Sequence, residues 1–256
     1  MLFHEIIFGP IKSRRLGISL GINLLPATGK ICTFDCIYCE CGYNADGRTK
    51  QSFPPREVVA QALEAKLQEL KNTGITPDVL TFSGNGEPTL HPEFEGIIDD
   101  TIELRNKYFP QAKISVLSNA TMIDKESVFR ALNKVDNNIL KLDSVFEHQV
   151  KLIDQPSQPS FSVTKLIENL KRFNGNLIIQ TIFFKGVHNG QFIDNTTEEE
   201  VNAWIEILKE IHPKQVMIYT IDRATPEKNL QKISLEELNI IAGKLKKAGF
   251  NVSVSG

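Results

Sequence analysis

All four cysteines of the 256-residue chain lie within one short stretch, from Cys32 to Cys41. Buried structural cysteines usually scatter through a core, whereas clustered ones bind a metal or react. Cys32, Cys36 and Cys39 follow a Cys-x3-Cys-x2-Cys spacing, and a short loop with this spacing can direct three thiolates toward one soft ion or cluster. The stretch therefore predicts a metal or iron–sulfur centre.

The number of nearby ligands discriminates between metals. A structural zinc site needs four ligands, usually from two separated pairs, but the chain has no second pair of Cys or His residues and its five histidines lie far apart. On a 4Fe–4S cluster, three cysteines leave one iron without a protein ligand, comparable to the open position of a catalytic zinc. Three ligands thus favour chemistry at the metal over electron storage. A zinc-binding loop and a ferredoxin-like carrier stay open as alternatives.

Cys32, Cys36 and Cys39, with Tyr38 just before the last, resemble the cluster motif of the radical S-adenosylmethionine (SAM) superfamily. In that family SAM chelates the open iron through its amino and carboxylate groups. An electron from the reduced cluster then cleaves SAM into methionine and a 5′-deoxyadenosyl radical, which abstracts hydrogen from a substrate. The resemblance implies a 4Fe–4S cluster and SAM as cofactors, with Tyr38 near the adenine. Cys41 is then an extra thiol rather than a ligand.

Strand and helix patterns alternate along the chain. The predicted strands are 18–25, 78–82, 113–117, 139–142, 177–183, 215–221 and 251–255, and the predicted helices are 56–72, 92–108, 125–134, 162–173, 197–211 and 234–248. Repeated strand–helix units with short connections indicate a parallel sheet, either a barrel or part of one, with an open doubly wound sheet as the alternative.

The resemblance favours the first of these, a partial (β/α)6 TIM-like barrel of the radical SAM type. We expect one core domain, 1–256, in which 1–17 form an N-terminal extension and 18–226 the barrel. The remaining residues, 227–256, would add a C-terminal helix and one further strand. In a barrel of this kind, the site lies at the carboxyl ends of the strands.

The residues after the second predicted strand are Ser83-Gly84-Asn85-Gly86-Glu87-Pro88. Glycines permit positive φ and close approach of a ligand, and the Glu87 carboxylate can accept hydrogen bonds from an ammonium group. The segment resembles the family's Gly-Gly-Glu-Pro motif, which implies that Gly84, Gly86, Glu87 and Pro88 bind the amino group of SAM. Asn85 between the glycines makes the spacing a variant. A strand-to-helix turn is the alternative interpretation.

The next two strands also end in polar residues. Ser118 and Asn119 resemble the family's position that contacts the SAM carboxylate or ribose, although both are common in turns. Lys141 and Asp143 share one face of the fourth strand, and opposite charges buried inside a barrel are costly unless paired or liganded. The resemblance implies that Lys141 lies near the SAM carboxylate and Asp143 near the ribose. A structural ion pair is the alternative.

Later polar residues fall where a barrel enzyme would hold its substrate. Some could bind an anion, but a solvated surface is the default for the basic ones. These candidates are Gln180, Thr181, Tyr219, Asp222 and Arg223 at the fifth and sixth strands, and Lys12, Arg14 and Arg15 before the first.

Within the superfamily, residues 13–21 and the cysteine motif are most similar to stand-alone iron–sulfur oxidoreductases related to the wyosine-type tRNA-modifying enzymes. This similarity implies radical modification of a tRNA guanine derivative, with flavodoxin or ferredoxin as the reductase. However, no cysteines remain for a second cluster, and the net charge of −2 gives no bulk attraction to nucleic acid. A glycyl-radical activating enzyme acting on a partner protein, an enzyme acting on a small molecule and a non-catalytic metal-binding module stay open.

The composition is that of an ordinary globular protein, with 41% hydrophobic and 23% charged residues. The first residues lack the basic and apolar regions of a signal peptide, and no apolar run approaches the roughly 20 residues that cross a bilayer. We therefore expect a cytoplasmic protein without membrane contact, in a compartment where thiols stay reduced.

Overall fold

The computed structural model describes residues 2–13, 15–44 and 52–256, so Arg14 lies outside the described residues. The described chain forms two compact units. The first comprises Met1–Cys32, Asn44–Ser118 and Met122–Asn138, and the second comprises Thr33–Tyr43, Asn119–Thr121 and Ile139–Gly256. The predicted boundaries at 17 and 226 stay predictions.

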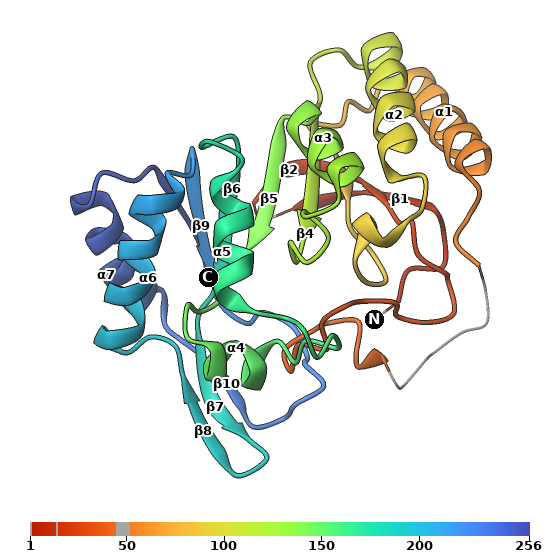
Figure 1. The fold of residues 1–256 in the computed structure, drawn as a ribbon. Helices are drawn as coiled ribbons and strands as arrows, with labels where there is room; N and C mark the ends of the chain where they lie inside the picture. The colour runs from red at the N-terminus through yellow and green to blue at the C-terminus, as the bar shows by residue number, and fades with distance from the viewer. Residues whose placement is uncertain (1, 14, 45–51) are drawn as a thin grey trace. The chain divides into compact units, whose positions relative to one another are not determined.

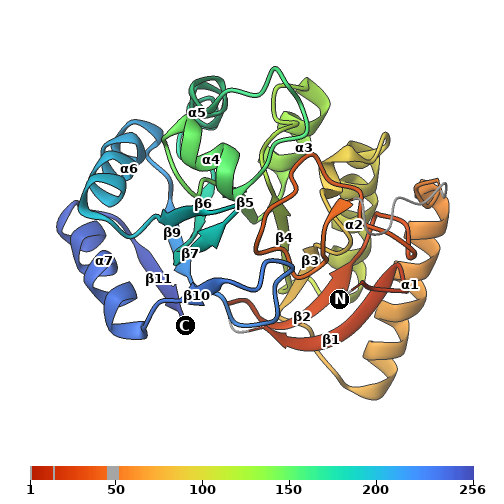
Figure 2. The same ribbon diagram turned by 90° about the horizontal axis from the view of Figure 1, so that it is seen from below.

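The first unit is built on a four-stranded sheet. Strand β1 (Ile7–Ser13) pairs antiparallel with β2 (Gly17–Ile22), and β2, β3 (Val79–Phe82) and β4 (Lys113–Ser118) are parallel neighbours. The helices of this unit are α1 (Arg56–Thr73), α2 (Phe94–Tyr108) and α3 (Glu126–Lys134). In Figures 1 and 2 they lie side by side along one face of the sheet.

Helix α1 shows why this side of the sheet is covered. Val59, Leu63, Leu67 and Leu70 are all buried, and residues at this spacing form the apolar face of a helix. Gly74 ends the helix in the left-handed conformation that glycine adopts without strain.

The second unit has four parallel strands in the order β5 (Asn137–Lys141, of which Ile139 and the residues after it belong to this unit), β6 (Ile178–Ile182), β9 (Gln215–Tyr219) and β11 (Val252–Ser255). Its helices are α4 (Glu147–Ile153), α5 (Val163–Lys171), α6 (Glu198–Ile211) and α7 (Leu235–Lys247). Figure 2 shows α5, α6 and α7 along one face of these strands. There Trp204 of α6 packs edge-on against Phe183 beside the sheet.

A small antiparallel sheet in the second unit differs from the predicted pattern. Its order is β10 (Leu230–Lys232), β7 (Phe184–His188) and β8 (Gln191–Asp194). Asn189 and Gly190 both have positive φ and connect β7 to β8, as a two-residue hairpin turn requires. Figure 1 shows the hairpin extending beyond the end of β6.

The seven predicted strands and six predicted helices are all present, with their ends shifted by a few residues. Helix α2 begins at Phe94 rather than at residue 92, because Pro92 lies in the turn before it. Strand β1, the hairpin, β10, α4 and a short 3-10 helix, η2 (Pro88–Leu90), were not predicted. No helix within 2–13, 15–44 and 52–256 is long and apolar enough to cross a membrane.

Candidate functional site

The cysteine stretch forms turns rather than regular structure. Cys36 is buried, while Cys32, Cys39 and Cys41 are partly exposed. The amide of Cys39 donates to the carbonyl of Cys36 at 3.0 Å, which closes a turn between these two residues. Among the described residues, no three His, Cys, Asp or Glu side chains meet as a metal site. The spacing along the chain therefore carries the prediction of a cluster.

In the first unit, the start of the cysteine stretch is bonded to the glycine loop. The amide of Ile31 donates to the carbonyl of Asn85 at 2.9 Å, and the amide of Glu87 donates to the carbonyl of Ile31 at 3.0 Å. Gly86 has φ 136°, and a Cβ there would lie 1.8 Å from the Ile31 carbonyl oxygen. Glycine is therefore required by the approach of the neighbouring backbone, and Cys32 begins directly beside the loop that carries Glu87.

Glu87 is a buried carboxylate with several donors around one oxygen. Its Oε1 accepts from the Ser118 hydroxyl at 2.9 Å, from the Thr89 hydroxyl at 2.5 Å and from the Thr89 amide at 3.1 Å. Glu87 also caps η2, as the turn interpretation expected. The structure thus brings together Glu87 and Ser118, which the sequence placed at the ends of two different strands.

Asn85 explains the variant spacing of the glycine motif. Its side chain is completely buried, and its amide group donates to the carbonyls of Phe3 at 2.7 Å and Pro26 at 2.9 Å. The Asn85 side-chain oxygen accepts from the Phe3 amide at 2.8 Å. Asn85 therefore fixes the N-terminal segment against the glycine loop.

In the second unit, Asn119 contacts the residue that follows Cys32. Its side-chain amide donates to the Thr33 hydroxyl at 2.8 Å, and its oxygen accepts from the Thr121 hydroxyl at 2.8 Å. The described contacts of Asn119 therefore support the cysteine stretch.

Tyr38, Lys141 and Asp143 form one buried cluster in the second unit. The ammonium of Lys141 lies 2.6 Å from Asp143 Oδ2 and 2.7 Å from Asp154 Oδ1, and the Tyr38 hydroxyl is hydrogen-bonded to both Lys141 and Asp143. The same ammonium donates to the Cys36 sulfur at 3.3 Å. Only 14% of the Lys141 side chain is exposed, against 1% and 2% for the two carboxylates.

The charges in this cluster alter one another's protonation. Burial disfavours the ammonium of Lys141, but the carboxylates of Asp143 and Asp154 together raise its pKa well above the ordinary value. Burial also raises the pKa of Asp154 to about 7, although Lys141 opposes this shift. Lys141 therefore stays protonated at neutral pH and can donate hydrogen bonds to acceptors around it.

Asp154 was not predicted from the sequence. It follows α4, which has no strong sequence signal, and it contacts the cysteine stretch through the backbone as well as through Lys141. The Asp35 amide donates to the Asp154 carbonyl at 2.9 Å, and the Ile37 amide donates to the Ile153 carbonyl at 3.0 Å. The end of α4 thus holds the cysteine stretch in place.

Gln180, one of the predicted substrate residues, lies next to Lys141 in the sheet. It is paired with Lys141 between the parallel strands β5 and β6, so the two side chains leave the sheet on the same face. The side-chain nitrogen of Gln180 is buried and has no hydrogen-bond partner within the described part of the chain. This amide can donate to a bound molecule.

Arg223 contacts the cysteine stretch from another segment. It is exposed, and its guanidinium lies 2.7 Å from the carboxylate of Glu40, next to Cys39. Arg15, by contrast, is partly buried. Binding of an anion by either arginine stays a prediction.

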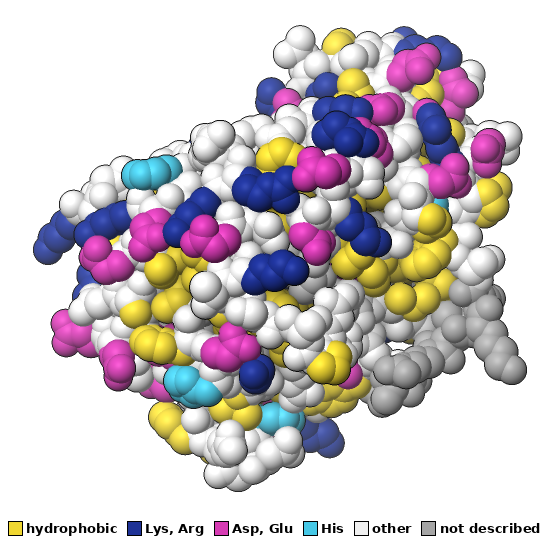
Figure 3. Space-filling model, viewed as in Figure 1, with side chains coloured by type: hydrophobic (Ala, Val, Ile, Leu, Met, Phe, Trp, Pro, Cys, Tyr) yellow, Lys and Arg dark blue, Asp and Glu magenta, His cyan; other side chains and the backbone are white. Residues whose placement is uncertain are grey.

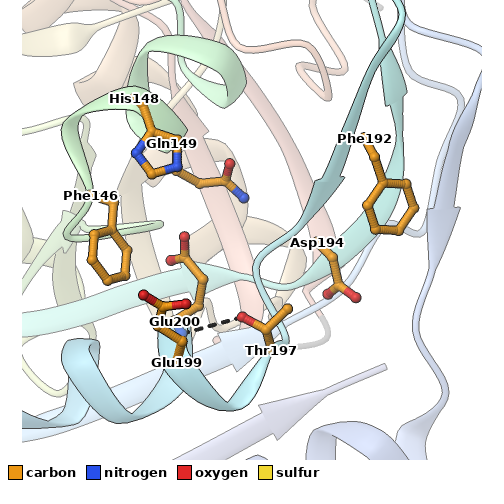
Figure 4. Close-up of a pocket in the computed structure, with 8 residues that line it drawn as sticks. All are labelled: Phe146, His148, Gln149, Phe192, Asp194, Thr197, Glu199 and Glu200. Carbon is orange, nitrogen blue, oxygen red and sulfur yellow. Dashed lines mark hydrogen bonds between the residues drawn. The ribbon is translucent and has the colours of Figure 1, made fainter.

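A hollow of about 220 Å³ lies elsewhere in the second unit (Figure 4). Phe146 and Phe192 lie on opposite sides of it, and the buried carboxylate of Glu200 accepts from the Ser144 hydroxyl at 2.8 Å. Burial raises the pKa of Glu200. None of the residues that line this hollow was predicted as a site residue: Phe146, His148, Gln149, Phe192, Asp194, Thr197, Glu199 and Glu200.

The surface in Figure 3 shows Lys and Arg side chains interspersed with Asp and Glu rather than gathered into a basic patch. Lys134 of α3, for example, lies 2.7 Å from Asp99 and 3.4 Å from Glu95 of α2. Mixed charges of this kind give no strong field for attracting a polyanion to this face.

Comparison with known proteins identifies related sequences. Residues 27–195 match the family model of the Radical SAM superfamily. The UPF0026 protein of Helicobacter pylori (strain J99) is 32% identical over 239 residues, covering 91% of this chain and 71% of that protein. The UPF0026 protein of Methanocaldococcus jannaschii is 31% identical over 242 residues, covering 92% and 70%.

Solved structures with the same arrangement include SuiB of Streptococcus suis bound to S-adenosylmethionine, with a TM-score of 0.64 and 16% identity over 90% of this chain. The chain spans about half of SuiB, 49% of its length. A radical SAM methyltransferase from Sphaerobacter thermophilus has a TM-score of 0.66 and 13% identity, covering 93% of this chain and 65% of that one.

A structure of TYW1 with a lysine–pyruvate adduct has a TM-score of 0.62 and 14% identity, covering 90% and 73%. At these identities the similarity concerns the fold alone. It confirms the predicted fold class, a partial (β/α)6 TIM-like barrel.

Proposed function

The chain belongs to the radical SAM superfamily of SAM-dependent radical enzymes, and from that membership we propose that Cys32, Cys36 and Cys39 ligate its 4Fe–4S cluster. The contact between Ile31 and Gly86 carries this proposal. It holds the first cysteine beside the loop of Glu87, where the family's amino-group motif would be expected. Three thiols within eight residues are the donor set that such clusters use.

We further propose which residues bind SAM. Glu87, in the loop formed by Gly84, Gly86 and Pro88, accepts the ammonium group, and its burial and its bond to Ser118 support this role. The carboxylate and ribose are held by Ser118, Asn119, Lys141 and Asp143, and the adenine lies near Tyr38. The buried amide of Gln180 beside Lys141 is a further donor that fits a bound polar molecule.

When bound, the reduced cluster supplies the electron that cleaves SAM. The chain's own residues contribute orientation and exclusion of water. Ile37 packs with Ile153, Ile182, Phe184 and Ile193 in a buried cluster, so the middle of the cysteine stretch rests on a rigid apolar support. Such support limits solvent access to the side of the loop that carries Cys36.

The first test is anaerobic reconstitution with iron, sulfide, dithionite and SAM. We expect 5′-deoxyadenosine as a product, measured by liquid chromatography. Cys36→Ala should abolish the product and lower the bound iron, because a three-cysteine site cannot lose a ligand and keep its cluster.

Cys41→Ala is the matched control, since it removes a thiol from the same stretch that is not a proposed ligand. It should retain the iron content and the product. Loss of the cluster in Cys41→Ala would show that the ligand assignment is wrong. Binding of zinc alone, without iron or sulfide, would overturn the proposed function.

We propose a tRNA base as the substrate class, with flavodoxin or ferredoxin as the electron donor, on the strength of the sequence resemblance.

The TYW1 structure carries a lysine–pyruvate adduct, but a carbonyl adduct forms on a neutral amine. Two carboxylates hold Lys141 as an ammonium, so Lys141 is not suited to form such an adduct. Mass spectrometry of nucleosides from treated tRNA tests the substrate, and unchanged tRNA alongside 5′-deoxyadenosine formation would reject it.

A further inference from the structure

The surroundings of Cys36 contain a cation that the sequence did not connect with the cluster. We propose that Lys141 donates a hydrogen bond to the Cys36 sulfur in the cluster-loaded protein, that Asp154 holds Lys141 in position, and that the pair sets the reduction potential of the cluster. This inference rests on the proposed function, since it requires Cys36 to be a cluster ligand.

The geometry needed for such a bond is already present. Lys141 Nζ lies 3.3 Å from Cys36 Sγ, a normal distance for a donor to sulfur. Cys36 is buried and Lys141 is 14% exposed, so water competes little for either group. A thiolate ligand has no proton to donate, so the bond between Lys141 and this sulfur has the ammonium as its donor.

Asp154 and Asp143 differ in how they are held. Asp143 has further partners, since its Oδ1 accepts from the Ile182 amide at 3.1 Å and its Oδ2 is bonded to the Tyr38 hydroxyl. Asp154 is 2% exposed, forms an ion pair with Lys141 at 2.7 Å and shares a side-chain hydrogen bond with Cys36. Its backbone is fixed to the cysteine stretch by the Asp35 amide. Asp154 therefore couples the position of Lys141 to that of the cysteine loop.

The two charges should act on the cluster in opposite directions. Reduction adds negative charge, and a cationic donor at a ligand sulfur stabilises that charge, which raises the potential. A buried carboxylate nearby disfavours the added charge and lowers the potential. Lys141 thus makes the cluster easier to reduce, and Asp154 limits this effect while keeping Lys141 in place.

The test is a potentiometric titration of the reconstituted full-length protein, followed by electron paramagnetic resonance of the reduced cluster. Lys141→Met should shift the midpoint to a more negative potential. At a fixed solution potential, the ratio of reduced to oxidised cluster should fall roughly tenfold. For one electron, this corresponds to a shift in the midpoint potential of about 59 mV. Asp154→Asn, which keeps the size of the side chain, should shift the midpoint the other way. Lys141→Arg, which keeps a cationic donor, should restore part of the shift.

Lys171→Met is the matched control. Lys171 lies on α5 in the same unit and is also paired with two carboxylates, Glu168 at 2.8 Å and Glu210 at 2.6 Å. It makes no described contact with the cysteine stretch, so the midpoint should not change. Iron and sulfide content are measured in parallel for every variant.

Opposite shifts for Lys141→Met and Asp154→Asn support the inference, because a purely structural role would not reverse the sign. Unchanged midpoints, or shifts in the same direction, overturn it while leaving the proposed function intact. If Lys141→Met fails to fold or to bind iron, the sign of the Asp154→Asn shift decides alone. Absence of a cluster in the unmodified protein would reject the proposed function itself.

Discussion

Buried charges in the second unit are accommodated in two different ways. Lys141 is surrounded by groups of opposite charge, so its ammonium is stabilised in spite of burial. Glu200, on the first turn of α6, has a hydroxyl donor from Ser144 but no described ion pair, and burial raises its pKa. A neutral group of the same shape would avoid the cost of burying its charge.

We therefore expect Glu200→Gln to stabilise the protein at pH 8. The pKa of Glu200 is raised in the folded state, so protonation of this side chain stabilises the folded protein. This stabilisation is complete below the ordinary pKa of 4.5, and it is lost as pH rises through the raised pKa of the folded state. The gain at pH 8 should be on the order of 1 kcal/mol, or about 2–4 °C in Tm.

Thermal unfolding at pH 4 and pH 8 measures this difference, and at pH 4 the variant and the unmodified protein should nearly coincide. Glu199→Gln, on the exposed neighbour, serves as the control and should change little at either pH. An equal or lower Tm for Glu200→Gln at pH 8 would contradict the expected cost of burial.

Some site residues could be recognised from the sequence and one could not. The cysteines were recognisable by spacing, and Lys141 and Asp143 by the alternation of a strand. Asp154 lies eleven residues after Asp143 and follows a helix that has no strong sequence signal. Its role depends on the contact between α4 and the cysteine stretch, which no local pattern specifies.

At the scale of elements, the contact between the glycine loop and the cysteine stretch depends on Gly86. Gly86→Ala would place a methyl group 1.8 Å from the Ile31 carbonyl oxygen, in a conformation with φ 136° that side chains rarely adopt. The strain and the clash should cost about 3 kcal/mol. We expect lower stability and a lower iron content after reconstitution, because the loop of Cys32 is displaced.

Gly243→Ala provides the comparison for that variant. Gly243 lies within α7 and a Cβ there meets no atom within 4 Å, so alanine should be neutral or stabilising by up to about 1 kcal/mol. Chemical denaturation and iron analysis of both variants give the result. A Gly86→Ala protein with unchanged stability and iron would show that the two loops do not depend on this contact.

The elements that were predicted correctly have burial patterns that are visible in the residue types. Helices such as α1 bury one continuous face, and strands such as β3 are short runs in which every residue is buried. The β7–β8 hairpin was missed, although Asn189-Gly190 is a strong hairpin signal. Strand β1 was missed because Gly9 and Pro10 interrupt its pattern and produce an irregular register with β2.

At the scale of the whole molecule, the distribution of charge bears on the proposed tRNA substrate. The net charge is −2, and the face in Figure 3 carries both signs intermixed. Non-specific binding to nucleic acid depends on the number of phosphates that basic residues neutralise. We therefore expect weak binding to heparin, with elution below roughly 150 mM salt, since few phosphate-like groups can be contacted at once.

The distribution of charge also determines how the binding of tRNA should depend on salt. If a tRNA base enters the site, recognition should rely on a few directed contacts, and the slope of log K against log salt should be about −2 or shallower. Fluorescence anisotropy with labelled tRNA between about 50 and 200 mM salt measures this slope. A slope near −5 would instead reveal an extensive basic surface, and Arg223→Gln and Arg15→Gln would then show which arginines contribute to it.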